Sequence, residues 1–501
     1  MSKSNSLVIL SVGVVAAVVT ACTDLNVKET SSIVVPQSAS GSFSGLPNVT
    51  DALQASYNNL GNNFASQQDI YSLGVHVTAE MIPPTRGVDW GDNGVWRTLD
   101  QHTWDATHAF VLNSWNNLNS EVFKATQIIA TTSATKAQVA EAKFLRAWNM
   151  FHVMDYWGQV PVRDVNQGVN DNPKVLSRSE AFDYIVKDLT EALPDLAEAR
   201  TATSVNPTAT KASANYLLAK LYLNKTVYKS AKPEGPYTFD KADMDNVVKY
   251  VDAITAAGFK LSPNYFDNFT KNATSEIILT GAQGSPESRW MMTLHYNQKP
   301  SGWNGFATLA DFYDKFEAND TRKGVAPKKD GTPLSGIGRG FLIGPQYDEK
   351  GAAIIDERSN KPLSFTRDVP LSGAATDKGI RVIKYHPVDA NKYIIIRYGD
   401  AYLMKVEALF RSGNTAGALT AINDLRKLRG ASALTSVKED DIFDEIGRET
   451  YWEGGKRTVE VRYGKFTTGI GVDNKNAYTV LYPIPSDAIA SNPNLKQNTG
   501  Y

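Results

Sequence analysis

Apolar residues recur along most of this chain at the three- and four-residue spacing of amphipathic helices. The segment 177–196 carries one such stripe, and it opens with Ser177 and Glu180 at the spacing of an N-terminal capping box. The segment 137–158 is apolar almost all round, which predicts a helix buried on every side. Together these patterns predict a mostly α fold.

One segment has the pattern of a complete helix pair. Residues 399–430 contain a helix to about Phe410, a turn at "RSGN", and a second helix that ends at Gly430. A looser pair combines residues 214–228 with residues 239–254. Small residues stand where the first two helices approach each other, at Ala401, Ala408, Ala418 and Ala421. This is the tetratricopeptide layout, although the units do not repeat at a fixed period.

The pattern changes between residues 259 and 392. This stretch is rich in Gly, Pro, Asn and Asp, and it shows few helical patterns beyond "LADFYDKFEA". Because long loops on a rigid frame commonly carry binding function, we expect the ligand site to use this half. We divide the body of the chain, residues 46–501, into an N-terminal helical part (46–258), a loop-rich insertion (259–392) and a C-terminal part (393–501).

The N-terminus has the features of a secretory signal. Lys3 precedes the apolar run Leu7–Thr20, which is shorter than the roughly 20 residues that a membrane-spanning helix requires. Cys22 follows and is the only cysteine in the chain. The stretch "VTAC" resembles a bacterial lipobox, with Val19 where Leu is commonest. We therefore predict a signal peptide over residues 1–21, a lipid on Cys22, and a flexible polar tether over residues 22–45.

Composition and motifs exclude several classes of function. Lys plus Arg number 52 and Asp plus Glu number 53, and like charges do not cluster, which argues against a nucleic-acid partner. The sequence lacks the phosphate-loop, dinucleotide, zinc-protease and nucleophile-elbow motifs. The six histidines are scattered, so core or hydrogen-bonding roles are expected and no metal site is predicted. A glycosidase, which needs only two suitably spaced carboxylates, stays open as an alternative.

Four blocks in this chain, in the right order, resemble the SusD/RagB family of outer-membrane nutrient-binding lipoproteins of Bacteroidetes. They are "EAKFLRAWNMFHVMDYWGQVPV", "YIIIRYGDAYLMKVEALFRSGN", "ETYWEGGKRTVEVRYGKF" and "LYPIPSDAIASNPNLKQNTGY". The chain departs from the family pattern at Val406, Glu460, Val461 and Thr499. With the lipobox, the resemblance covers nearly the whole mature chain.

The resemblance implies a single mostly α, SusD-like domain with tetratricopeptide-like helix pairs as scaffold and a loop-rich ligand-binding half. It implies no catalysis and no cofactor, and a lipid-anchored protein in the outer membrane that faces the cell exterior. The implied partner is a SusC-like TonB-dependent transporter. Most members of the family bind glycans and some bind peptides, so a peptide ligand remains an alternative, as does a purely structural tetratricopeptide protein.

The tryptophans that lie in segments with loop composition are the candidate ligand platform. Trp90 lies in "TRGVDWGDNGVWR" and Trp303 in "KPSGWNGFATL", segments that correspond to the ligand face of the family. A flat indole packs against the C–H face of a sugar, and polar side chains bond its hydroxyls. Predicted partners are Arg86, Asp89, Asp92 and Asn304, with Trp96, Tyr296 and Trp290 as further candidates. Trp115, Trp148, Trp157 and Trp452 are expected in the core. A β-glucan such as laminarin is the candidate ligand.

Overall fold

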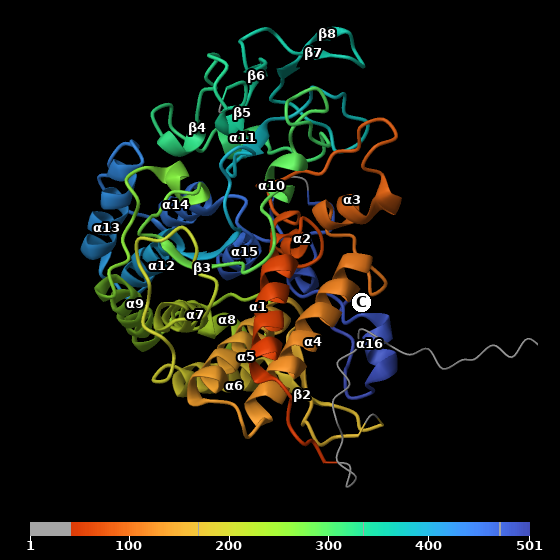
Figure 1. Cartoon of the computed structure of the whole chain (residues 1–501), viewed down its shortest axis with the longest axis vertical. Coiled ribbons are helices and arrows are strands. Elements are labelled where there is room, and N and C mark those ends of the chain that lie inside the picture. Colours follow the sequence, from red (N-terminus) through yellow and green to blue (C-terminus); the bar gives the residue numbers. More distant parts are fainter. Residues whose placement is uncertain (1–41, 169, 334, 470–471) are drawn as a thin grey trace, which may run out of the picture.

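The structure is a computed structural model that describes residues 42–168, 170–333, 335–469 and 472–501. Helices from both ends of the chain form one frame, and short strands and loops from the middle of the chain cover one end of it (Figure 1). The N-terminal helices of the frame are α1 (Val49–Ala65), α2 (Ile70–Val75), α3 (Val95–Asp100), α4 (Ala109–Ala130), α5 (Lys136–Trp157), α6 (Arg178–Ala192), α7 (Lys211–Leu223), α8 (Lys225–Lys229) and α9 (Lys241–Ala256). The C-terminal ones are α12 (Tyr398–Arg411), α13 (Thr415–Leu428), α14 (Glu439–Thr450), α15 (Lys456–Arg462) and α16 (Ser486–Ser491).

Helix α5 is the central element of the frame, and its burial confirms the prediction from its apolar pattern. It packs against α1, α4 and α6, and fifteen of its residues from Ala140 to Trp157 are buried. A capping box between Thr135 and Gln138 satisfies free N–H groups at its start. Gly158 ends it in the left-handed conformation, at φ 72°. The predicted capping box of Ser177 and Glu180 likewise begins α6.

Both predicted helix pairs are present. Helix α12 packs against α13, and α7 packs against α9; α12 also contacts α7 and α9, so the two pairs form one layered scaffold. Ala401, Ala408 and Ala418 are fully buried, as expected for small residues at close helix contacts. The mostly α fold with tetratricopeptide-like pairs is confirmed.

The middle of the chain consists of short antiparallel strands joined by loops. Strands β10, β5 and β4 form a three-stranded sheet, and the other strands pair in twos as β1–β2, β3–β11, β6–β9 and β7–β8. The helical pattern of "LADFYDKFEA" yields only the single turn α11. The bounds are β1 (Gln159–Val162), β2 (Lys174–Ser177), β3 (Ile277–Thr280), α10 (Ser288–Met291), α11 (Ala310–Tyr313), β4 (Gly324–Val325), β5 (Arg339–Leu342), β6 (Gly344–Pro345), β7 (Ile355–Asp356), β8 (Lys361–Pro362), β9 (Ser364–Phe365), β10 (Arg381–Ile383) and β11 (Ile394–Arg397).

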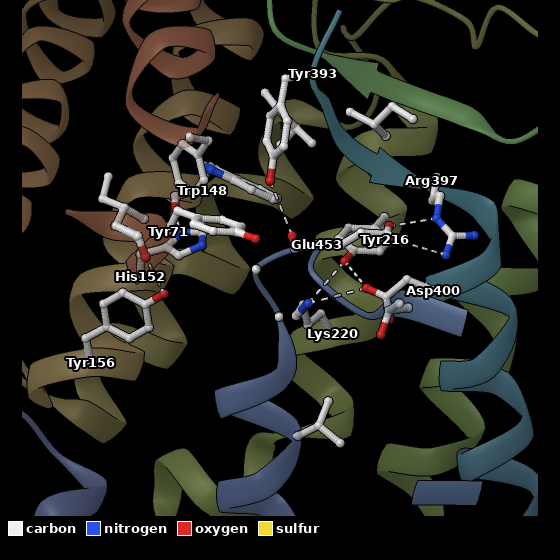
Figure 2. A pocket seen from close by; sticks show the side chains of 18 residues that line it. Tyr71, Trp148, His152, Tyr156, Tyr216, Lys220, Tyr393, Arg397, Asp400 and Glu453 are labelled. Carbon is white, nitrogen blue, oxygen red and sulfur yellow. Dashed lines mark hydrogen bonds and ion pairs between the residues drawn. The ribbon is translucent and has the colours of Figure 1, made fainter. Parts of the chain in front are cut away.

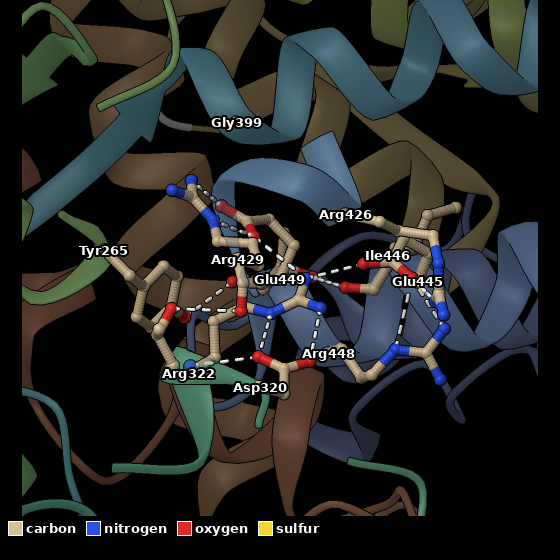
Figure 3. A network of polar contacts seen from close by, with 12 residues as sticks. Tyr265, Asp320, Arg322, Gly399, Arg426, Arg429, Glu445, Ile446, Arg448 and Glu449 are labelled. Atoms are coloured by element: carbon tan, nitrogen blue, oxygen red, sulfur yellow. Dashed lines mark hydrogen bonds and ion pairs between the residues drawn. The ribbon is translucent and has the colours of Figure 1, made fainter. Parts of the chain in front are cut away.

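A buried network of charged side chains joins the loop-rich half to the helical frame (Figure 3). Glu449 of α14 is fully buried, and its carboxylate accepts hydrogen bonds from Arg322 at 3.1 Å, Arg397 at 3.0 Å and Arg429 at 2.8 Å. Arg397 also bonds Glu276, which lies just before β3, at 3.0 Å. Burial alone would raise the pKa of Glu449, but the surrounding guanidinium groups of Arg429 and Arg397 hold it well below its usual range. The carboxylate is therefore ionised.

The first turn of α12 contains Gly399, because the buried charged network leaves no room for a side chain at this position. Its N–H donates to Glu276 Oε2 at 3.0 Å. A Cβ at this position would lie 2.1 Å from Arg397 Nη1 and 3.0 Å from Glu449 Oε1. A larger residue would thus collide with the network, which accounts for the small residue in the sequence block that begins at Tyr393.

Candidate functional site

The segment 83–104 is only partly a loop. Arg86 and Asp89 exchange two backbone hydrogen bonds, of 3.0 and 3.1 Å, which close a tight turn with Gly87 and Val88 at its tip. A 3₁₀ turn (Asp92–Gly94) and α3 follow. The composition of this segment predicted a loop throughout, and this was wrong for α3. The last glycine, Gly94, directly precedes α3, which is amphipathic and buries Trp96 and Leu99 on one face.

Trp303 and Trp90 lie side by side and form the centre of the candidate site. Trp303 is 53% exposed, whereas Trp90 is half-buried. The indole N–H of Trp90 donates to the carbonyl oxygen of Trp303 at 2.9 Å, and the two ring centroids are 6.4 Å apart. Trp90 also packs on Phe306 with a centroid distance of 5.0 Å, and a Cβ at Gly305 would lie 2.3 Å from its ring. Trp90 therefore supports the loop that presents Trp303.

Three polar side chains lie next to this aromatic pair. Asp89 accepts hydrogen bonds through Oδ2 from the Tyr296 hydroxyl at 2.7 Å and from Arg358 Nη1 at 2.9 Å. These bonds, from Tyr296 first and then Arg358, lower the pKa of Asp89. The guanidinium of Arg358 lies over the Tyr296 ring at 4.4 Å. We call Trp90, Trp303, Asp89, Tyr296 and Arg358 the Trp303 shelf.

Arg358 belongs to the shelf, but the sequence analysis missed it. It lies between β7 and β8, and Asp356 fixes this hairpin by accepting bonds from the Ser359 hydroxyl at 2.8 Å and the Thr376 hydroxyl at 2.6 Å. Nothing local marks Arg358 in the sequence, because its partner Asp89 is 269 residues away. Two exposed apolar side chains flank these residues, Val88 at 97% and Ile355 at 45% exposure.

Two of the predicted polar contacts are corrected by the structure. Arg86 is 1% exposed, and its guanidinium donates to the carbonyl oxygens of Gly305, Ala375 and Lys378. Asn304 is fully buried; its amide donates to the Thr376 carbonyl at 3.0 Å and accepts from Arg381 at 2.8 Å. Both side chains hold the loops together from inside, so neither reaches a ligand on the surface.

The remaining candidates also have structural partners. Trp96 is 3% exposed, and its N–H donates to Asp92 Oδ2 at 2.7 Å, so Trp96 belongs to the core and Asp92 anchors it. Trp290 is half-buried against the small core of the loop-rich half that contains Leu294 and Phe365. Trp115, Trp148, Trp157 and Trp452 are buried, as predicted.

The histidines have the structural roles expected of them. His102, His152 and His386 bond backbone carbonyl oxygens, at 2.8, 2.9 and 3.2 Å. Within the ranges that the structure describes, acidic, histidine and cysteine side chains do not gather into a group that could hold a metal ion. In the same ranges, none of the helices is long and apolar enough to span a membrane.

The geometry of the shelf predicts that replacing Asp89 has a moderate effect on ligand affinity. Asp89→Ala should weaken binding of the glycan expected from the sequence about three- to tenfold, because it frees Tyr296 and Arg358 but leaves the Trp303 ring in place. Isothermal titration measures the change. Asp245→Ala is the control, because Asp245 is an exposed carboxylate of α9 whose partner is Lys241. An Asp89→Ala protein that binds as tightly as the parent would exclude Asp89 from the ligand's surroundings.

The chain is similar to known proteins both in sequence and in structure. The model of the SusD family matches residues 357–472, and the model described as starch-binding, associating with the outer membrane, matches residues 55–223. The starch-binding protein SusD of Bacteroides thetaiotaomicron is 29% identical over 426 residues, which cover 74% of each chain.

The fold is found in solved structures. A SusD-like protein from Bacteroides fragilis superposes with a TM-score of 0.68 at 20% identity and covers 90% of this chain and 96% of its own. Surface glycan-binding protein A from Bacteroides thetaiotaomicron, solved in complex with laminarihexaose, superposes with a TM-score of 0.64 at 18% identity and covers 90% of this chain and 98% of its own. Two family models on separate segments, a curated relative and this shared fold agree in one respect: the chain is similar to proteins of the SusD family along most of its length.

Proposed function

We propose that this protein is a cell-surface glycan-binding lipoprotein that captures a polysaccharide or oligosaccharide on the Trp303 shelf. The observation that carries the proposal is the half-exposed indole of Trp303, held by Trp90 and bordered by the polar groups of Asp89, Tyr296 and Arg358. Such a ring gives a rigid platform for a sugar's C–H face, and the border supplies hydrogen bonds.

The relatives support a carbohydrate ligand. One is named as a starch-binding protein and another was solved with laminarihexaose. Both relatives are named as binding proteins, which supports the expectation that the chain has a binding role and no catalytic one. Laminarin, a β-glucan, is the ligand we propose first.

Affinity electrophoresis through gels that contain laminarin, starch or xyloglucan tests the proposal. We expect at least one polysaccharide to retard the protein, with laminarin the first candidate, and no reducing sugar to appear on prolonged incubation. Migration unchanged by every polysaccharide, together with binding to a peptide library, would overturn the glycan proposal.

We further propose that the captured glycan passes to a SusC-like TonB-dependent transporter. The family resemblance and the family model named for association with the outer membrane support this step. Co-purification from detergent-solubilised outer membrane tests it: a transporter should accompany the tagged protein, and recovery of the tagged protein without one would contradict the step.

The proposed membrane anchor is Cys22, which lies outside the described residues. Cys22→Ala should give a protein that is released from the membrane fraction or remains unprocessed, because the chain has no other cysteine to carry a lipid. Fractionation followed by intact-mass analysis measures this. A correctly cleaved Cys22→Ala protein that stays fully in the membrane would disprove lipid anchoring at this residue.

A further inference from the structure

A cavity lies inside the helical frame (Figure 2), and none of the residues of the Trp303 shelf lines it. It has a volume of about 80 Å³ and lies between α5, α7, α12 and the segment that follows α14. Seven of the 18 residues that line it have aromatic rings, and three of the tyrosine hydroxyls bond backbone carbonyl oxygens. Tyr71 donates to the Trp452 carbonyl at 3.1 Å, Tyr156 to that of Ile70 at 3.4 Å, and Tyr393 to that of Glu453 at 3.4 Å.

One end of the cavity is polar. Lys220 Nζ donates to the Tyr216 hydroxyl at 3.1 Å and to Asp400 Oδ2 at 3.5 Å, and the Tyr216 hydroxyl donates to the same carboxylate oxygen. Among the described residues, these bonds leave the third hydrogen of Lys220 and the second oxygen of Asp400 without a partner. The cavity thus offers one donor beside one acceptor.

His152 provides a second acceptor. Its Nδ1 lies 2.9 Å from the Trp148 carbonyl oxygen, so Nδ1 carries the proton and Nε2 has a free lone pair. Burial lowers the pKa of His152 to about 4, which keeps the ring neutral at physiological pH. In Figure 2, His152 and the pair of Lys220 and Asp400 lie on opposite sides of the space.

The charges around the cavity compensate one another. Lys220 is paired with Asp400, and Arg397 is paired with Glu453 at 2.7 Å. A cation or an anion would therefore meet no unpaired opposite charge and would lose its hydration. A hydroxyl group suits the site better, since one hydroxyl can accept from Lys220 and donate to Asp400 or His152, while its carbon frame packs on the aromatic rings.

We propose that this cavity is a second binding site, which takes a vicinal diol. The cavity volume of about 80 Å³ limits the size of the part of a ligand that it can enclose. For comparison, a cavity of roughly 150 Å³ holds benzene, which has six non-hydrogen atoms. By this comparison the cavity encloses about three to four non-hydrogen atoms. A vicinal diol unit, with two carbons and two hydroxyl oxygens, has this size. The diol belongs either to a small free polyol or to the end of a sugar unit that projects from the opening. This site is independent of the Trp303 shelf.

Saturation-transfer NMR with glycerol tests the proposal directly. Glycerol should bind the full-length protein saturably, and 1,2-dimethoxyethane, which has similar carbons and oxygens but no hydroxyl, should bind at least tenfold more weakly. Methyl β-glucoside, titrated against the Trp303→Ala protein so that the shelf does not contribute, distinguishes the two sources of the diol: tighter binding than glycerol assigns the site to a sugar end, and weaker binding assigns it to a free polyol. Failure of both glycerol and the glucoside to bind saturably would overturn the proposal.

Two variants locate the binding. Gly455 lines the cavity, and a Cβ there would have Lys220 Nζ as its nearest neighbour at 3.7 Å, so Gly455→Leu fills the space and leaves the polar groups intact. Lys220→Met removes the donor. Each should weaken glycerol binding at least tenfold, whereas Lys225→Met, whose ammonium is paired with Asp243, should not.

If either Gly455→Leu or Lys220→Met fails to fold, the glycerol affinity of the other variant still tests whether the diol binds in this cavity. Unchanged glycerol binding in a folded variant would place the diol elsewhere. Laminarin binding at the shelf should persist in both variants, so failure of this site and failure of the proposed function give different results.

Discussion

We expect Glu449→Ala to be among the most destabilising single substitutions in this protein, lowering the free energy of unfolding by about 3–5 kcal/mol. The carboxylate lies between Arg322, Arg397 and Arg429 with no exposure to water. Its removal leaves three buried guanidinium groups close together with fewer acceptors. The loss measures the cost of unpaired buried charge, and it does not mean that the ion pairs themselves contribute this much to stability.

Urea unfolding measures the change. Glu439→Ala is the matched control, because Glu439 lies on the same helix, is half-exposed, and its partner Arg411 keeps a second ion pair with Glu407. It should cost at most about 1 kcal/mol. If Glu449→Ala were as stable as Glu439→Ala, the network would not be what joins the loop-rich half to the frame.

Trp90→Ala should lower both stability and glycan affinity. Trp90 packs on Phe306 and Gly305 and donates its N–H to the backbone of Trp303. Because it is half-buried, we expect a loss of about 2–3 kcal/mol, below the ~3–5 kcal/mol of a core tryptophan. This differs from the interpretation based on sequence, in which Trp90 and Trp303 were equivalent exposed platforms.

Calorimetric melting together with a laminarin titration tests this double effect. Trp90→Phe separates the contribution of ring packing from that of the hydrogen bond. This variant keeps an aromatic ring against Phe306 but loses the N–H that orients the Trp303 loop. A Trp90→Ala protein that melts and binds as the parent does would show that Trp90 has no supporting role.

The frame could be predicted from sequence because its signals are local. The apolar pattern of α5, the capping box at Ser177 and the small residues of the α12–α13 pair each depend on neighbours within a few turns. Such local signals did not predict the burial of Trp96. Its glycine-rich surroundings indicate a loop, but the ring is buried by Phe110 and Phe306, which come from other parts of the chain.

The polar side of the shelf could be predicted only in part, for a related reason. Arg86 and Asn304 are next to the right tryptophans in sequence, but both turn inward to satisfy the backbone carbonyl oxygens of the loops. Arg358 is far from both in sequence and reaches the shelf only because the β7–β8 hairpin folds toward Asp89. Burial and long-range pairing decide which polar residue faces outward, and neither has a local pattern.

The most direct test of this account is an equilibrium titration of laminarin against the parent, Trp303→Ala and Val325→Ala. Trp303 and Val325 are both more than half exposed, at 53% and 56%, but Val325 lies on the edge strand β4 outside the shelf. Trp303→Ala should bind at least tenfold more weakly, a loss of about 1.4 kcal/mol or more. It should melt within a few degrees of the parent, and Val325→Ala should match the parent in both respects. Unchanged affinity in a well-folded Trp303→Ala protein would contradict the assignment of the shelf as the glycan site.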